Sequence, residues 1–227
     1  MTERGAGVLL SSCPATCDNR RSVWQDPVMD SVDAAWLRIE AWLAGHAPAT
    51  LATLRPPAGL DQIEAAEAEL GMSFPADVIA SLRRHDGARL DRDSAWTCFE
   101  LPPFFRPLPV EEVRFHWRTR AKAVALTEAE HGDMSWHWDR RWIPVAASRG
   151  ADCRFVVGER ASPRFGRLGR AYHADPAQLD DPQRSLALLL QAVADSLEQE
   201  VPVEGCWPFV NAHGGLDWKL PGQRQRG

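Results

Sequence analysis

One histidine in this sequence stands beside an acid in a pattern that could support general base catalysis. His85 is followed by Asp86 and Gly87, and an imidazole oriented by a carboxylate is a common proton acceptor in enzymes. The same residues lie at the end of a short predicted helix, where a histidine can bind the last carbonyls and a glycine can end the helix. We therefore interpret this dyad as structural, with catalysis as the less favoured alternative.

Motifs for nucleophilic catalysis and phosphate binding are missing from the sequence. There is no Gly-x-Ser-x-Gly elbow. The glycine-flanked run 166–169 lacks the lysine and hydroxyl residue of a P-loop, and it precedes no predicted helix, so it reads as a turn between strands. The acid pairs 111–112 and 180–181 fall at predicted helix starts, where the helix dipole accounts for them. We predict that the protein has no catalytic residues, and an enzyme of unrecognised type stays a minor alternative.

Seven histidines raise the question of a metal site. The densest set is His131, Asp133 and His137, with His116 upstream. Zinc sites need three or four converging ligands, and a separation of six residues between the two histidines suits neither one helix face nor one strand face. The sequence therefore predicts no metal and no cofactor.

The aromatic run 136–142, Trp-His-Trp-Asp-Arg-Arg-Trp, has the composition of a protein-binding surface. Tryptophan and arginine are over-represented among interface hot spots, and two residues at i and i+2 in extended chain share a face. Asp152 is a further candidate, because it is polar on an otherwise apolar predicted strand. The predicted protein-binding residues are Trp136, Trp138, Arg140, Trp142 and Asp152. In the alternative interpretation, Trp142 belongs to the core and the others cover a sheet edge.

Composition and charge narrow the class of partner. The 227 residues carry a formal net charge of −5, with a pI near 5.8. Nucleic-acid binding usually requires a basic patch, so this balance disfavours it and suits a basic protein partner. Five cysteines at irregular spacings predict no disulfide framework, and Cys153 is expected to be buried. Without a secretory signal or a membrane-spanning apolar run, the expected location is the cytoplasm.

The apolar pattern divides the chain into three parts. Residues 1–29 show no periodicity and are predicted to be disordered, which makes Met29 a candidate for the true start. Residues 30–201 form the predicted domain. Residues 202–227 are a C-terminal extension that is too rich in aromatic residues to be a solvated tail, so we expect it to fold back on the domain.

The expected elements are helices first, then strands, then a helix. Three helices are predicted with marked ends: from a cap at Ser31 to Gly45, from Asp61 to Gly71, and from Pro75 at the first helical position to a left-handed Gly87. Further along, the pattern predicts strands over 95–101, 142–147, 151–157 and 168–173, a short helix over 110–119, and a last helix opening at Pro182 with Asp181 as its cap. Burial of one face is expected for the strand 151–157. This order predicts an α+β fold with helices packed on one face of an antiparallel sheet.

Four of these patterns, in this order, resemble the SMI1/KNR4 (SUKH) superfamily and suggest a bacterial member. They are the tryptophan-paired helix 35–43, the run 59–71 continuing into 74–87, the segment 142–157 with its Trp-Ile-Pro and Gly-Ala-Asp, and the closing helix 184–200. The resemblance covers about residues 33–201 and implies the same α+β architecture.

The resemblance also implies a function. Bacterial members are often immunity proteins that neutralise a toxin domain by binding it, and fungal members act as regulators through protein contacts. We therefore expect a non-enzymatic protein-binding module, with a toxin domain as the first candidate partner. The alternative is an intracellular regulatory or scaffold protein with an endogenous partner. The sequence does not indicate an oligomeric state.

Overall fold

Helices occupy the N-terminal part of the chain, and strands enter only after residue 105. The computed structural model describes residues 27–90, 95–132, 136–150, 152–172, 175–180 and 184–220. Four helices come first: α1 (Pro27–His46), α2 (Pro48–Leu51), α3 (Leu60–Leu70) and α4 (Ala76–Arg84). The predicted disordered segment lies outside the described residues up to position 26. Its last three residues belong to α1, which begins earlier than the expected cap at Ser31.

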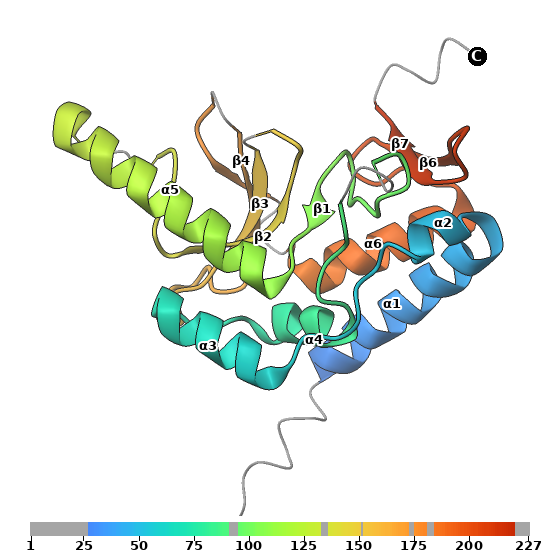
Figure 1. The fold of residues 1–227 in the computed structure, drawn as a ribbon, viewed down its shortest axis with the longest axis horizontal. Helices are drawn as coiled ribbons and strands as arrows, with labels where there is room; N and C mark the ends of the chain where they lie inside the picture. The colour runs from blue at the N-terminus through green and yellow to red at the C-terminus, as the bar shows by residue number, and fades with distance from the viewer. Residues whose placement is uncertain are drawn as a thin grey trace, which may run out of the picture.

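The second half of the chain builds the sheet, and one long helix crosses in front of it in Figure 1. The strands of this sheet are β1 (Arg106–Pro107), β2 (Trp142–Ala147), β3 (Cys153–Val157), β4 (Leu168–Ala171) and β5 (Gln178–Leu179), and the helix α5 (Val110–His131) lies between β1 and β2. They form one antiparallel sheet in the order β1-β2-β3-β4-β5. Helix α6 (Leu186–Gln199) and a hairpin of β6 (Trp207–Val210) and β7 (Leu216–Lys219) complete the chain. The predicted α+β class is confirmed.

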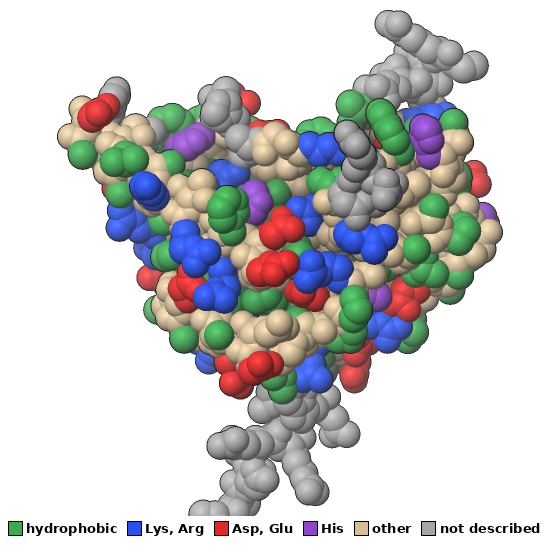
Figure 2. All heavy atoms as spheres, viewed as in Figure 1, with side chains coloured by type: hydrophobic (Ala, Val, Ile, Leu, Met, Phe, Trp, Pro, Cys, Tyr) green, Lys and Arg blue, Asp and Glu red, His purple; other side chains and the backbone are tan. Residues whose placement is uncertain are grey.

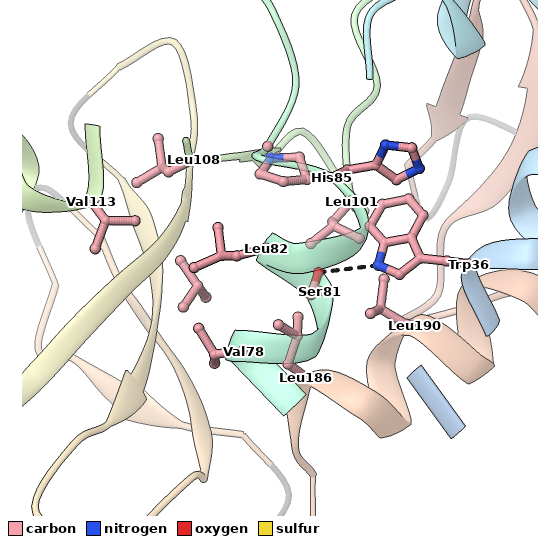
Figure 3. Close-up of a pocket in the computed structure, with 13 residues that line it drawn as sticks. Trp36, Val78, Ser81, Leu82, His85, Leu101, Leu108, Val113, Leu186 and Leu190 are labelled. Carbon is pink, nitrogen blue, oxygen red and sulfur yellow. Dashed lines mark hydrogen bonds between the residues drawn. The ribbon is translucent and has the colours of Figure 1, made fainter. Parts of the chain in front are cut away.

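Helix α1 packs against α4 and α6 through one apolar stripe. Trp36, Ile39 and Leu43 are buried at helical spacing, as the sequence predicts. The Trp36 indole N–H donates to Ser81 Oγ on α4 at 3.1 Å. The residues around this bond enclose a cavity of about 20 Å³, which is room for roughly one water molecule (Figure 3). Leucine and valine side chains dominate its walls, so this cavity is part of the core.

Helix α4 ends differently from the prediction. Pro75 is the N-cap, one residue before the helix, and the helix stops at Arg84 with His85 in extended backbone. Gly87 does have a left-handed φ of +66°. Its conformation serves a close approach, because a Cβ there would lie 2.5 Å from the backbone nitrogen of Pro109. Gly71, by contrast, ends α3 at the expected position, and it is left-handed, with φ of +65° and open space around it.

Strand β3 is buried on both faces. All five of its residues are buried, whereas the sequence predicted burial of one face only. Successive side chains of a strand point to opposite faces, so each face of the sheet must be covered here. Phe155 lies under Trp142, with ring centroids 4.0 Å apart and nearly parallel planes. On the other face, the guanidinium of Arg154 lies over the ring of Phe105.

Other predicted elements differ in extent. Residues 95–101 form turns and irregular chain in place of a strand, with a single bridge from Leu101 to Phe105. Helix α5 runs for 22 residues, more than twice the predicted length, because residues 120–131 are mostly strong helix formers. Helix α6 starts at Leu186 with Ser185 as its cap, and the predicted cap Asp181 lies outside the described residues.

The C-terminal extension folds back on the domain, as its aromatic residues predict. The N–H of Leu216 donates to Thr50 Oγ1 at 2.9 Å, and the Trp218 indole N–H donates to the carbonyl of Glu100 at 2.8 Å. Leu216 and Trp218 are both buried. The hairpin therefore covers part of the core between α2 and the loop before β1. None of the helices that the structure describes has both the length and the apolarity to cross a lipid bilayer.

Candidate protein-binding surface

The aromatic run 136–142 connects α5 to β2 and does not form one extended face. Residues 136, 137, 140 and 141 lie in turns, and only Trp142 belongs to a strand. Trp136 is 50% exposed, whereas Trp138 is 1% exposed. The expectation that these two indoles share a face is therefore wrong, because the i, i+2 rule holds for extended chain and the backbone turns here.

Trp138 is a core residue that also forms a wall of a surface groove. Its ring meets Trp142 and Phe155 edge-on, with centroid distances of 5.5 and 5.8 Å. The Arg120 guanidinium lies 4.9 Å from the ring centroid, within cation–π range. The indole Nε1 is buried and has no hydrogen-bond partner among the described residues. A buried indole N–H usually has an acceptor, so this atom is an unused donor beside the groove.

The remaining predicted residues are spread over the surface. The carbonyl of Arg140 accepts the indole N–H of Trp117 at 3.0 Å, and its guanidinium lies 3.7 Å from Glu128. Both contacts attach Arg140 to α5. Asp152 is half-buried and precedes β3, at the opposite end of the β2–β3 hairpin from Trp142. The structure thus joins Trp138 with Trp142 and leaves Trp136, Arg140 and Asp152 outside that contact.

A groove of about 450 Å³ lies between α5 and the residues that follow it. One wall comes from α5 and the other from the start of the aromatic run and the β2–β3 turn. The lining residues are Phe115, His116, Thr119, Arg120, Ala123, Val124, Thr127, His137, Trp138 and Gly150. The α5 residues recur at helical spacing, so a continuous strip of the helix faces the groove.

Three large apolar side chains on α5 and in the connection that follows it are open to solvent. Phe115, which lines the groove, is 56% exposed, Leu126 on the same helix is 63% exposed, and Trp136, next to the lining residue His137, is 50% exposed. Figure 2 shows hydrophobic and histidine side chains along this helix, with basic side chains on its lower side. An apolar strip of this kind with a polar rim is typical of a protein-interaction site.

The groove carries positive charge from its wall. Arg120 lies in the wall, and His116 beside it is half-buried. Burial, together with the charge of Arg120, lowers the pKa of His116 below its usual value. His116 is therefore neutral at pH 7, and Arg120 is the permanent cation among the groove residues.

The other predicted chemistry takes structural roles. His85 Nδ1 lies 2.9 Å from the carbonyl of Arg55, and its Nε2 lies 2.8 Å from the Glu40 carboxylate. Asp86 accepts the N–H of Val110 at 2.8 Å, at the first residue of α5. Asp86 also pairs with the Arg55 guanidinium at 3.2 Å, so both side chains hold the chain around Arg55, and the imidazole is paired with Glu40 and not with Asp86.

The metal candidates do not form a cluster in the described chain. His116 and His137 both line the groove, while Asp133 and the side chain of His131 lie outside the described residues. Among the residues that the structure does describe, no three histidines, cysteines or acids are grouped closely enough to hold a metal ion. Cys98, Cys153 and Cys206 are free and buried, and burial raises the pKa of the Cys98 thiol to about 12.

One charged cluster was not predicted from the sequence. Arg154 is fully buried in β3, and it pairs with Asp180 at 3.0 Å and also with Glu204. Arg170 binds the second oxygen of Asp180 at 2.8 Å, and Arg184 binds Glu204 at 2.6 Å. Asp180 was interpreted as a helix-start acid, but it is a buried counter-ion. The signal was an arginine within the apolar run Cys-Arg-Phe-Val-Val of residues 153–157.

Fold and surface together define an α+β domain with exposed aromatic and apolar side chains along one helix. The model of the SMI1/KNR4 family (SUKH-1) matches residues 57–199, and the chain belongs to this family. Two proteins, both named KNR4/SMI1 homolog, are similar to it. The Eremothecium gossypii protein is 47% identical over 100 residues, which are 44% of this chain and 15% of that protein. The Kluyveromyces lactis protein is 47% identical over 53 residues, 23% of this chain and 10% of that protein.

The predicted family resemblance is thus confirmed at the level of the family. Both of these relatives are fungal, and neither supports the expected bacterial origin. The chain covers only a small fraction of their length, so the activities and partners of the whole proteins are not transferred to it.

Proposed function

We propose that this chain is a non-enzymatic protein-binding module and that its partner binds along α5. The observation that carries this proposal is the groove of about 450 Å³ along α5, together with the exposed side chains of Phe115 in its wall, Leu126 on the same helix and Trp136 next to the lining residue His137, each at least half exposed. Large aromatic and aliphatic side chains beside a preformed groove are the usual anchors of an interface. Trp138, which is 1% exposed, forms a fixed part of the groove wall beneath these side chains.

The proposed partner is a protein, and two roles follow from the family. In the first, the chain is an immunity protein, like many bacterial members of the family, and it neutralises a toxin domain by binding over it. The net charge of −5 favours long-range encounter with a basic partner, which must then place a neutral or acidic group opposite Arg120 in the groove wall. In the second, the chain is an intracellular regulatory or scaffold protein. The fungal relatives named KNR4/SMI1 homolog support that alternative. The free, buried thiols support a cytoplasmic location for either role.

The test is affinity capture with matched surface variants. Tagged native chain, Trp136→Ala and Leu126→Ala are used to capture proteins from the cells that make the chain, and eluted proteins are identified by mass spectrometry. Leu37→Ala is the control, because Leu37 is 54% exposed on α1, outside the proposed surface. We expect one stoichiometric partner with the native chain and the control, and at least tenfold less of it with the two α5-surface variants.

The identity of the captured protein distinguishes the two roles. A toxin domain supports immunity, and an endogenous housekeeping protein supports regulation. If the variants and the control retain the partner equally, the α5 surface is not the binding site and the proposal fails.

A further inference from the structure

A second concave surface lies at the end of β2, separate from the groove along α5. Asp139, Arg141 and Trp142 line it together with the loop that joins β3 to β4. This cleft has a volume of about 670 Å³. Its lining shares no residue with the groove that Trp138 lines, so the two surfaces can be tested independently.

One arginine of the cleft is already neutralised. The Arg141 guanidinium donates to both carboxylate oxygens of Asp139, at 2.9 and 3.0 Å from Nε, and to Glu159 at 3.2 Å. Burial raises the pKa of Asp139, but the hydrogen bonds from Arg141 outweigh this effect and hold the pKa below its usual value. Both acids of the cleft wall are therefore engaged with Arg141.

Two further arginines of the cleft have no counter-ion in the described part of the chain. The guanidinium groups of Arg164 and Arg167 make neither an ion pair nor a hydrogen bond with a described residue. The Nε of Arg167 is buried without a hydrogen-bond partner. Both arginines line the cleft, so an anion bound there would supply the counter-ion that the described residues do not.

The loop that carries these arginines is held rigidly. The N–H of Val157 donates to the carbonyl of Arg167 at 3.0 Å, and the N–H of Gly166 donates back to Val157 at 2.9 Å. Within the loop, Ser162 Oγ accepts the N–H of Arg164 at 3.1 Å, which leaves the serine O–H free to donate. A cationic loop fixed in this way loses little conformational entropy when it binds a ligand.

The rest of the cleft wall is apolar. Trp142 is half-buried with one ring face on Phe155, and Val157 and Leu179 extend this wall. We propose that the cleft binds a single anionic group, a phosphate monoester or a carboxylate, carried on a flat apolar body that packs against Trp142. The two engaged acids beside the arginines and the net charge of −5 disfavour a polyanion such as nucleic acid.

The experiment is a titration of the full chain with three small probes. Binding is detected by isothermal calorimetry or by NMR of the arginine Nε–H signals. Phenyl phosphate and benzoate carry an anion on a flat ring, whereas inorganic phosphate is the anion alone. We expect phenyl phosphate or benzoate to bind at least tenfold more tightly than inorganic phosphate, because only they bury apolar surface against Trp142. The tighter of the two ring probes identifies the anion as phosphate or carboxylate.

Charge-removing variants show whether the named arginines hold the anion. Arg167→Gln and Arg164→Gln are expected to weaken the tighter probe at least tenfold. Lys122→Gln on α5 is the control, because it removes one exposed charge outside the cleft. Arg164 is exposed, so its variant tests the site even if Arg167→Gln alters the loop. The proposal is wrong if no probe binds the native chain at millimolar concentration. It is also wrong if all three variants bind the tighter probe as strongly as the native chain does.

Discussion

The side chain of Asp77 in α4 caps the start of α6, 110 residues further along the chain. Its Oδ2 accepts the backbone N–H of Ala187 at 3.1 Å, and its Oδ1 accepts the N–H of Val78 at 2.9 Å. Both donors are N–H groups in the first turn of their helices, and that of Val78 also donates to the carbonyl of the N-cap Pro75 at 3.0 Å. One carboxylate therefore joins two helix N-termini, both of which favour negative charge.

Asp77 should make stability depend on pH in an unusual direction. The residue is 4% exposed, and burial raises its pKa above the usual value despite the backbone hydrogen bonds. A carboxyl group with a raised folded pKa contributes stability at low pH and loses it as the pH rises above the unfolded value, near 3.8. We expect the unfolding free energy of the native protein, relative to that of Asp77→Asn, to be highest below that pH in urea unfolding experiments. This difference in unfolding free energy should shrink as the pH rises through the folded pKa of Asp77. A difference that grows with pH would show that the ionised form is the favoured one.

Removal of the Arg154 side chain is expected to destabilise the protein strongly, because its acidic partners would stay buried. Arg154→Met leaves Asp180 and Glu204 in a buried site with one fewer cation. Removal of one partner from a buried ion pair costs roughly 3–5 kcal/mol of unfolding free energy. Guanidinium chloride unfolding at pH 7 measures this cost. The control is Arg160→Met, the same change at an exposed position, with an expected effect within about 0.5 kcal/mol. Equal effects of the two variants would contradict the assigned role.

Two left-handed glycines should respond differently to the same substitution. Gly71 and Gly87 have φ of +65° and +66°, so alanine costs about 1 kcal/mol of conformational energy at either site. Only Gly87→Ala also places a Cβ 2.5 Å from the Pro109 nitrogen, while Gly71 has open space. We expect Gly87→Ala to lower the melting temperature clearly more than Gly71→Ala in a thermal scan. Similar losses would show that the chain at residues 107–109 can move away.

The two tryptophans that begin the aromatic run should separate folding from binding. Trp138→Ala removes a buried indole and is expected to cost about 3–5 kcal/mol of unfolding free energy. Trp136→Ala removes a half-exposed indole, so its effect on unfolding should stay within about 1 kcal/mol. Chemical denaturation of both variants decides this. A stable Trp138→Ala protein would mean that the side chain is not part of the core.

The sequence predicts the elements whose pattern is local. The apolar stripe of α1, the end of α3 at Gly71 and strand β2 all follow from spacing and residue type. Residues 95–101 were predicted as a strand because β-prone residues dominate them. Their backbone groups instead bond to side chains elsewhere, as in the N–H of Phe99 donating to Thr53 Oγ1 at 3.0 Å.

The candidate surface is less predictable, because it depends on contacts across the chain. Trp136 and Trp138 are chemically identical in sequence, and only the turn between α5 and β2 decides which one is buried. The length of α5 was also underestimated. An apolar stripe marks a helix only where it packs, and much of the second half of α5 is exposed at the surface.

The packing of α1 on α6 bears on how the protein can be produced. The family match covers residues 57–199, whereas α1 and the β6–β7 hairpin lie outside it and both contribute buried side chains. A fragment trimmed to the match would uncover Leu190, Val193 and Leu197 on α6, all buried in the whole chain. Such a fragment would expose this apolar surface to solvent and should aggregate on expression. The unit that folds is therefore longer than the unit that the family shares.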